Sequence, residues 1–267
     1  MKFPNTPKKS LGQNFLTDQN IVAKIISIGN ISKGDTILEI GPGYGSLTKE
    51  IIKYKPKKIF AVEKDKRVTQ YIKKDLINYK NIEIINEDIL KIISKNNFGN
   101  NIIIFGNLPY NISSQVLASL ILLDKWPPWY KKVILMFQEE LANRIVAKYK
   151  TKEYGRLSIL ANWRLEIKKH FNVSRNCFYP SPKINSTVLS FEPKKYKYKL
   201  KNPKTLESVT RTLFSNRRKM INKSLTRIFK NNKNIAKELN INVSKRPEEL
   251  DNETFYKIAS KYEKLFN

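Results

Sequence analysis

Four consecutive residues, Asn107-Leu108-Pro109-Tyr110, combine the groups needed to hold a flat base by its exocyclic amine. They come one residue after the apolar run 102–105, so we expect them just past the carboxyl end of a buried strand, where open α/β sheets bind ligands. The Asn107 amide oxygen and a backbone carbonyl can accept the two N–H bonds of an amine. Pro109 fixes the turn and removes a competing donor, and Tyr110 offers a ring for stacking. An ordinary strand-to-helix turn is the alternative explanation.

A glycine-rich loop, Glu39-Ile40-Gly41-Pro42-Gly43-Tyr44-Gly45, closes the β-rich run 36–40. Glycines at the end of a strand let the backbone approach a nucleotide-like ligand, although a tight turn alone also explains them. Their spacing, with Ser46 next, does not match the dinucleotide pattern G-x-G-x-x-G. Glu39 would repel a pyrophosphate but attract the ammonium group of an amino acid. The loop therefore favours S-adenosylmethionine over a nicotinamide cofactor.

Two further acids stand at the ends of predicted strands. Glu63 lies 20 residues after Gly43, where a carboxylate accepts both hydroxyls of a ribose. Asp88 follows the next predicted strand and could accept from the amine of an adenine. Either acid alone could be a surface residue in a loop. Three acids at three successive strand ends, in a chain with only 23 acidic residues, make a stronger pattern.

The remaining apolar runs predict an α/β fold. Strands are expected at 36–40, 58–62, 82–85, 102–105, 133–137 and 186–191. Helices are expected between them, at about 66–76 and 115–123. This alternation predicts a parallel sheet covered by helices on both faces. A lysine-rich run closed by Pro203 marks a boundary, and the residues beyond it have only helical patterns. We therefore expect a first domain over 1–195 and a small all-α domain over 204–267.

The composition indicates a polyanionic partner. The chain has 267 residues and a net charge of +28, from 51 Lys and Arg against 23 acidic residues. A codon bias towards A and T can inflate the lysine content, but it does not readily explain the scarcity of acids. Nucleic-acid binding is therefore the expected consequence. A single cysteine, Cys177, excludes an internal disulfide and a cysteine-based zinc site, and no metal is expected. We expect a cytoplasmic monomer without a membrane span or signal peptide.

Four further motifs carry a resemblance to a known family over nearly the whole chain. They are Lys9-Ser10-Leu11-Gly12-Gln13-Asn14-Phe15-Leu16, Phe178-Tyr179-Pro180-Ser181-Pro182-Lys183, Phe214-Ser215-Asn216-Arg217-Arg218-Lys219 and Arg246-Pro247-Glu248-Glu249-Leu250. Together with the loop and the acids they resemble the rRNA adenine N6-dimethyltransferases, in particular the bacterial small-subunit branch. The resemblance implies a Rossmann-like class I methyltransferase sheet that binds S-adenosylmethionine. The cofactor residues it implies, together with those argued above, are Asn14, Leu16, Glu39, Gly41, Gly43, Glu63, Asp88 and Asn107.

The resemblance also implies the reaction: dimethylation of N6 on two adjacent adenosines near the 3′ end of small-subunit rRNA, with a role in small-subunit assembly and within a pre-ribosomal particle. We expect the Asn107 side chain and the Leu108 carbonyl to accept the amine hydrogens. Pro109 would shape the turn, and Tyr110 and Phe178 would grip the two faces of a base that has left its stack. Core packing beside Cys177 is the alternative for Phe178.

Basic residues of the carboxyl-terminal region are the candidates for RNA contact. On one continuous helix, Phe214, Ile221, Leu225 and Ile228 would share an apolar side that docks on the first domain. The residues expected to contact RNA are Arg217, Arg218, Lys219, Lys223, Arg227 and Lys230. Of these, Lys219, Lys223, Arg227 and Lys230 would share the side of the helix opposite the apolar one, and a solvated charged face is the alternative explanation for that basic side.

Three other functions are compatible with parts of this pattern. The large-subunit rRNA methyltransferases that confer antibiotic resistance also carry an Asn-x-Pro-Tyr run, but the Arg217-Arg218-Lys219 and Arg246-Pro247-Glu248-Glu249 segments favour the small-subunit branch. An RNA-binding assembly or transcription factor without catalysis would not need the three acids and Asn107. A dehydrogenase fits poorly because of the glycine spacing and Glu39.

Overall fold

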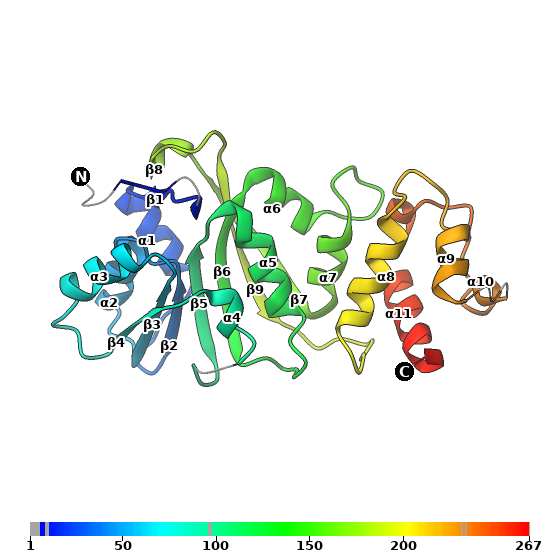
Figure 1. Ribbon diagram of the computed structural model, residues 1–267, viewed down its shortest axis with the longest axis horizontal. Coiled ribbons are helices and arrows are strands. Elements are labelled where there is room, and N and C mark those ends of the chain that lie inside the picture. Colours follow the sequence, from blue (N-terminus) through cyan, green and yellow to red (C-terminus); the bar gives the residue numbers. More distant parts are fainter. Residues whose placement is uncertain (1–5, 9–10, 96–97, 231, 233, 267) are drawn as a thin grey trace. The chain divides into compact units, whose positions relative to one another are not determined.

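The computed structural model describes residues 6–8, 11–95, 98–230, 232 and 234–266. It contains a seven-stranded sheet in the order β4-β3-β2-β5-β6-β9-β7 (Figure 1). The strands are β2 (Thr36–Ile40), β3 (Lys58–Glu63), β4 (Ile82–Asn86), β5 (Ile102–Asn107), β6 (Tyr130–Gln138), β7 (Leu165–Val173) and β9 (Ser186–Pro193). Strands β4, β3, β2, β5 and β6 run parallel, and β9 pairs antiparallel with β6. The predicted α/β fold with a mostly parallel sheet is confirmed.

Helices flank this sheet because its central strands are apolar on both faces. Residues 102–106 of β5 are all buried, as expected for a strand covered on both sides. Apolar residues of the first two helices pack with Ile37, Ile103 and Phe105 in one buried cluster. The helices that alternate with the strands are α1 (Gln19–Ser27), α2 (Ser46–Lys53), α3 (Lys66–Asp75), α4 (Ile89–Ile92), α5 (Tyr110–Ile121) and α6 (Glu139–Val146).

The chain forms two compact units, and their boundary is not a single point in the sequence. The first unit comprises residues 1–120, 127–142 and 167–193 and holds most of the sheet. The second comprises 121–126, 143–166 and 194–267. Its helices are α7 (Arg156–Arg164), α8 (Lys204–Phe214), α9 (Asn222–Ile228), α10 (Ile235–Glu238) and α11 (Asn252–Phe266). Two segments from the predicted first domain therefore belong with the helical unit. The functional division into 1–195 and 204–267 stays a prediction.

A buried arginine organises part of the second unit. The Arg164 side chain is 1% exposed, and its guanidinium lies 3.9 Å from the centre of a Trp163 ring. Its Nη1 donates to the carbonyls of Ile121 and Leu123, at 3.0 and 2.7 Å. A buried carbonyl without a hydrogen-bond donor lowers the stability of the fold. These two bonds therefore fix where residues 121–126 lie within the unit.

The prediction of one continuous helix across residues 214–230 is wrong. Helix α8 ends at Phe214 and α9 begins at Asn222, with a turn between them. The Ser215 hydroxyl bonds back to the Thr212 carbonyl, and Arg217 turns away to an ion pair with Glu248. Both contacts favour leaving the helix after Phe214. Phe214 and Lys219 therefore do not share a helix with the residues of α9.

Three strands were not predicted. Strand β7 lies at the sheet edge, and its charged residues hide the apolar pattern, as is common in edge strands. The other two form a separate antiparallel pair, β1 (Phe15–Leu16) with β8 (Phe178–Tyr179). This pair joins the amino-terminal segment (residues 11–16) to the aromatic motif at residues 178–183, a contact that a local sequence pattern cannot reveal.

Candidate active site

A pocket opens where β2, β3 and β5 end, at the carboxyl edge of the sheet. The structure brings eleven of the twelve predicted catalytic and cofactor residues into its lining: Asn14, Leu16, Glu39, Gly41, Gly43, Glu63, Asp88, Asn107, Leu108, Pro109 and Tyr110. They come from the amino-terminal segment, from three strand ends and from the start of α4 and α5. Parallel strands explain this convergence because their carboxyl ends meet at one edge.

The glycine loop has the left-handed backbone that its residue types predict. Gly41 and Gly43 have φ values of +70° and +56°. A Cβ on Gly43 would lie only 2.8 Å from the ring of Phe15, so glycine also makes room for the amino-terminal segment. Phe15 packs edge-on against Tyr44 with ring centres 4.7 Å apart. The glycine loop thus leaves its backbone accessible to a ligand and also packs against Phe15 of the amino-terminal segment.

Glu39 is the most buried acid of the pocket. Its side chain is 1% exposed, and Oε2 accepts a 2.6 Å hydrogen bond from the Thr48 hydroxyl on α2. Its Oε1 has no hydrogen-bond donor among the described residues. Burial raises the pKa of Glu39 to about 7. A buried carboxyl with an unused oxygen in a pocket wall fits a cationic group of a ligand, such as the ammonium of S-adenosylmethionine.

The two other acids have different surroundings. Glu63 accepts from the Asp65 amide at 2.8 Å, and burial raises its pKa. Asp88 caps α4 by accepting from the Leu90 amide at 3.0 Å, and its other oxygen bonds to Lys64 Nζ at 2.8 Å. This lysine lowers the pKa of Asp88, which therefore stays ionised at neutral pH. Both acids keep acceptor capacity towards hydroxyl and amine donors.

The orientation of the Asn107 amide follows from its partner. Asn107 Nδ2 lies 3.0 Å from the backbone carbonyl oxygen of Asn14. A carbonyl can only accept, so the NH₂ group must face Asn14 and Oδ1 must point the other way. Nearby, the Tyr110 hydroxyl is 2.8 Å from the hydroxyl of Ser186. The site therefore presents a fixed acceptor oxygen beside an anchored aromatic ring.

Phe178 is the predicted catalytic residue that does not line the pocket. Its side chain is 5% exposed and packs in the buried cluster with Leu16, which is its partner in the β1–β8 pair. This is the core packing that the sequence left open as the alternative. The neighbouring Tyr179 is 51% exposed. A grip by Phe178 on the target base stays a prediction.

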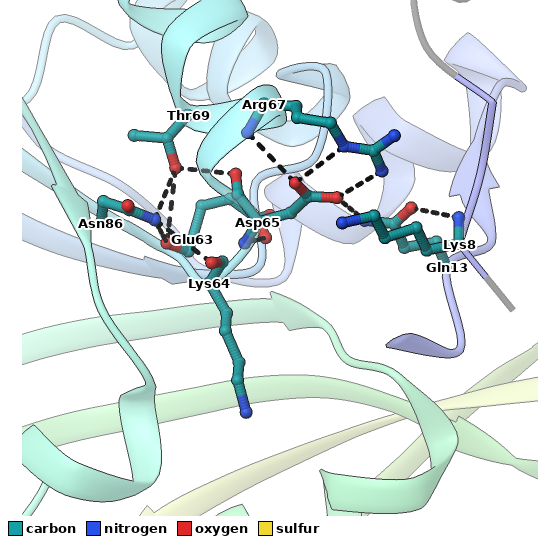
Figure 2. Close-up of polar contacts among 8 residues, drawn as sticks. All are labelled: Lys8, Gln13, Glu63, Lys64, Asp65, Arg67, Thr69 and Asn86. Atoms are coloured by element: carbon teal, nitrogen blue, oxygen red, sulfur yellow. Dashed lines mark hydrogen bonds and ion pairs between the residues drawn. The ribbon is translucent and has the colours of Figure 1, made fainter. Parts of the chain in front are cut away.

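A polar network beside Glu63 was not foreseen from the sequence (Figure 2). Asp65 accepts from the Gln13 side chain at 3.0 Å and from the Arg67 guanidinium at 2.8 Å. Gln13 Oε1 in turn accepts from the Lys8 amide at 2.7 Å. The only local signal was the position of Asp65 just before α3, which suits a helix cap. Its link to Gln13 joins residues 52 positions apart.

The predicted RNA-contacting residues differ in how free they are. Arg217 is half-buried and pairs with Glu248 at 2.7 Å. The other five are exposed: Arg218, Lys219, Lys223, Arg227 and Lys230. Lys223 and Arg227 of α9 and Lys230 just after it line a shallow groove together with Asn222 and Thr226. Leu225 and Ile228, on the opposite side of α9, are buried, and the adjoining Phe229 packs against α11 at Tyr262.

Within the described ranges, no helix is long and apolar enough to cross a membrane. The same residues hold no group of three or more His, Cys, Asp or Glu side chains that could bind a metal ion.

Known proteins resemble this chain over nearly its whole length. The family model for ribosomal RNA adenine dimethylase matches residues 4–264. The "Ribosomal RNA small subunit methyltransferase A" of Pelagibacter ubique (strain HTCC1062) is 44% identical over 97% of this chain and 97% of its own. The protein of the same name from Wolbachia sp. subsp. Drosophila simulans (strain wRi) is 36% identical over 99% and 97%.

Solved structures agree on the fold. A dimethyladenosine transferase from Plasmodium falciparum superposes with a TM-score of 0.77 and 28% identity, over 94% of this chain and 98% of its own. The 23S rRNA methyltransferase ErmE gives a TM-score of 0.66 at 21% identity, over 94% and 99%, and so supports the fold alone. With its pocket at the carboxyl edge of a class I methyltransferase sheet, and a family model matched over nearly its full length, this chain belongs to the ribosomal RNA adenine dimethylase family.

Proposed function

We propose that the protein transfers methyl groups from S-adenosylmethionine to N6 of adenosines in small-subunit rRNA. The observation that carries this proposal is the oriented Asn107 amide, which offers an acceptor oxygen inside the pocket. The names of the relatives support the choice of the small-subunit RNA. The sequence motifs support the finer target, two adjacent adenosines near the 3′ end, within a pre-ribosomal particle. We further propose that the protein acts in the cytoplasm as a monomer.

The pocket residues divide the cofactor between them in this proposal. Glu39 would hold the ammonium group, Glu63 the ribose hydroxyls, and Asp88 the adenine amine. Asn14, Leu16, Gly41 and Gly43 would contact the cofactor from the amino-terminal segment and the glycine loop. The bound cofactor supplies a methyl group on a positively charged sulfur. The support is the environment of each acid: a buried carboxyl for a cation, and two acids with spare acceptor capacity for hydroxyls and an amine.

Residues 107–110 would activate the target by orienting it. The N6 lone pair of adenine is delocalised into the ring, so this nitrogen is a poor nucleophile. Accepting its two hydrogens at Asn107 Oδ1 and at the Leu108 carbonyl would favour a more tetrahedral nitrogen, with its lone pair directed at the methyl group. Each transfer replaces one N–H bond by an N–CH₃ bond and releases one proton. Orientation of this kind can contribute roughly 7–11 kcal/mol in well-aligned cases.

RNA binding would use the exposed basic residues of the carboxyl-terminal region. Its support is the shallow groove on α9, where Lys223, Arg227 and Lys230 stand together. Phosphate contacts by such side chains position an RNA without reading its sequence. Arg217 is the exception among the six predicted residues, because its pairing with Glu248 gives it a structural role.

The competing functions have less support. The similarity to ErmE is one of fold, whereas the relatives at 44% and 36% identity are named for the small subunit. A binding factor without catalysis would not require the oriented amide or the three acids. Incubation of unmodified small subunits with the protein and S-adenosylmethionine tests the proposal. Nucleoside mass spectrometry should detect N6,N6-dimethyladenosine, and primer extension should stop at two adjacent adenosines; methylation confined to large-subunit RNA would contradict it.

Asn107→Ala should nearly abolish methyl transfer while leaving the fold and RNA binding close to normal. Loss of one preorganised polar group of this kind typically lowers the rate by about 10²–10³. Tyr110→Ala should instead weaken capture of the flipped base by roughly 1–3 kcal/mol. A single-turnover assay at saturating RNA and cofactor separates the two effects. Transfer by Asn107→Ala at the parental rate would remove this residue from the reaction.

Cofactor binding below pH 7 should release a proton from Glu39. With its pKa near 7, this carboxyl is largely protonated at pH 6, whereas a bound ammonium favours the ionised form. The affinity for S-adenosylmethionine should therefore rise between pH 5.5 and 7. Calorimetry at pH 6 in two buffers with different ionisation heats measures the release.

The matched variant for this measurement is Glu39→Gln. It keeps an acceptor for the Thr48 hydroxyl but cannot ionise. It should bind the cofactor more weakly and release fewer protons, with the remaining pH dependence coming from Glu63. An unchanged proton release in Glu39→Gln would show that Glu39 does not meet the ammonium.

The salt dependence of RNA binding should depend on the exposed basic residues. In the variant with Lys219, Lys223, Arg227 and Lys230 changed to Ala, each lost phosphate contact should reduce the log–log slope of affinity against salt by about 0.7–0.9. A variant with four exposed lysines of the first unit changed to Ala, Lys33, Lys73, Lys74 and Lys80, loses the same charge and should keep a slope close to the parental one. Equal slopes for the two variants would mean that these four basic residues are only a solvated surface.

A further inference from the structure

The amino-terminal segment (residues 11–16) is anchored at both ends, and Asn14 lies between the anchors. Downstream, the Leu16 carbonyl accepts from the Ser46 hydroxyl at 2.6 Å, and Phe15 and Leu16 pair with β8. Upstream, the Gln13 side chain donates to Asp65 at 3.0 Å. The backbone of Asn14 is therefore held from the glycine loop side and from the start of α3.

The upstream anchor, Asp65, is itself held in place by several hydrogen bonds to Arg67. Asp65 is 4% exposed, and it accepts from both Nε and Nη2 of Arg67, at 3.2 and 2.8 Å. It also caps α3 by accepting from the Arg67 amide. The Arg67 guanidinium lowers the pKa of Asp65 to about 2, so Asp65 is an ionised acceptor at any pH at which the protein works. Figure 2 shows Arg67 and Gln13 reaching Asp65 from two sides.

The orientation of Gln13 is determined by its two partners. The Lys8 amide can only donate, and the Asp65 carboxylate can only accept. Gln13 must therefore direct Oε1 to Lys8 and its NH₂ group to Asp65. Through Asp65, Gln13 also connects the amino-terminal segment to Glu63, because the Asp65 amide donates to Glu63 Oε1 at 2.8 Å.

The Gln13–Asp65 bond is connected to the Asn107 side chain through one backbone carbonyl, that of Asn14. Asn14 follows Gln13 directly, and its carbonyl receives the 3.0 Å hydrogen bond from Asn107 Nδ2. On the other side of Gln13, a Cβ added to Gly12 would lie 3.4 Å from Pro109 Cβ, so the segment passes close to the 107–110 turn. A shift of Gln13 would move the carbonyl that decides which way the Asn107 amide points.

We propose that Gln13 and Asp65 are positioning residues for Asn107. Their hydrogen bond holds the amino-terminal segment so that the Asn14 carbonyl keeps the Asn107 NH₂ group and leaves Oδ1 for the target amine. This inference rests on the proposed function, in which Asn107 receives an adenine amine. Gln13 also lines the pocket, but in this proposal neither residue touches the base, and each acts through the Asn14 carbonyl.

Gln13→Glu tests the link because it places a carboxylate opposite Asp65. At saturating RNA and cofactor, the single-turnover rate should fall about 10²-fold, the effect expected when a reacting group is displaced by about 1 Å. The rate of Gln13→Ala, which only removes the bond, should also fall, but by less. Gln115→Glu makes the same chemical change at an exposed position of α5 and should keep the parental rate.

Rescue separates positioning from a structural role. In the double variant Gln13→Glu/Asp65→Asn, the Asn NH₂ group can donate to the new carboxylate with the total charge unchanged, but it replaces the oxygen that also accepts from Arg67 Nη2, so that second bond is lost. Its rate should therefore rise above that of Gln13→Glu without reaching the parental rate, whereas Asp65→Asn alone should not exceed the double variant. The variants that disturb Asp65 should melt at a lower temperature than the parent, because Asp65 is 4% exposed, caps α3 and pairs with Arg67, so all rates are compared at a temperature at which circular dichroism shows every variant to be folded.

The outcomes are distinguishable. Parental rates for Gln13→Glu, or equal losses in Gln13→Glu and the double variant, would overturn the positioning role. If Asn107→Ala is inactive in the same assay while Gln13→Glu is fully active, only this inference fails. If Asn107→Ala is also fully active, the proposed function fails with it. Loss of cofactor affinity without loss of rate at saturation would assign Gln13 to cofactor binding and would likewise overturn the inference.

Discussion

The hydrogen bond from the Asn107 amide to the Asn14 carbonyl is the constraint on which the site depends. It connects residues 93 positions apart and gives an otherwise symmetric-looking amide one orientation. An amide turned by half a rotation would present two donors to a target amine that is itself a donor. A backbone carbonyl is a suitable partner because it cannot donate in any state of protonation. The amino-terminal segment, the glycine loop and the β1–β8 pair all contribute to holding that carbonyl in place.

The sheet supports this constraint by bringing acids of different character to one edge. Glu39 is buried on β2 and has a raised pKa, whereas Asp88 at the start of α4 pairs with a lysine and has a lowered one. Glu63 at the end of β3 is half-buried and accepts from the backbone of the loop that carries Asp65. Three carboxyls with different surroundings thus line one pocket, and a ligand with a cation at one end and neutral donors along its length would fit that order.

Sequence patterns predicted those features of the fold and of the site that depend on residues close together in the chain. The parallel strands, the glycine loop at the end of the first of them and the positions of Glu63, Asp88 and Asn107 follow from apolar runs and turn residues, and the structure has them where expected. The Gln13–Asp65 bond could not be predicted in this way, because it depends on how two segments meet after folding. The turn after Phe214 was missed for the same reason: Arg217 leaves the helix for Glu248, 31 residues away. Burial of Phe178 likewise reflects its strand partner Leu16 rather than its own neighbours in sequence.

The most direct test of this account is the pH dependence of methyl transfer by Asn107→Asp. An ionised carboxylate cannot donate to the Asn14 carbonyl, whereas a protonated one can donate with one oxygen and accept with the other, as the amide does. At saturating RNA and cofactor, the single-turnover rate of the variant relative to the parent should therefore rise about tenfold for each pH unit of acidification, until the new carboxyl is protonated. A ratio that is independent of pH, with the variant as fast as the parent at pH 8, would contradict the account.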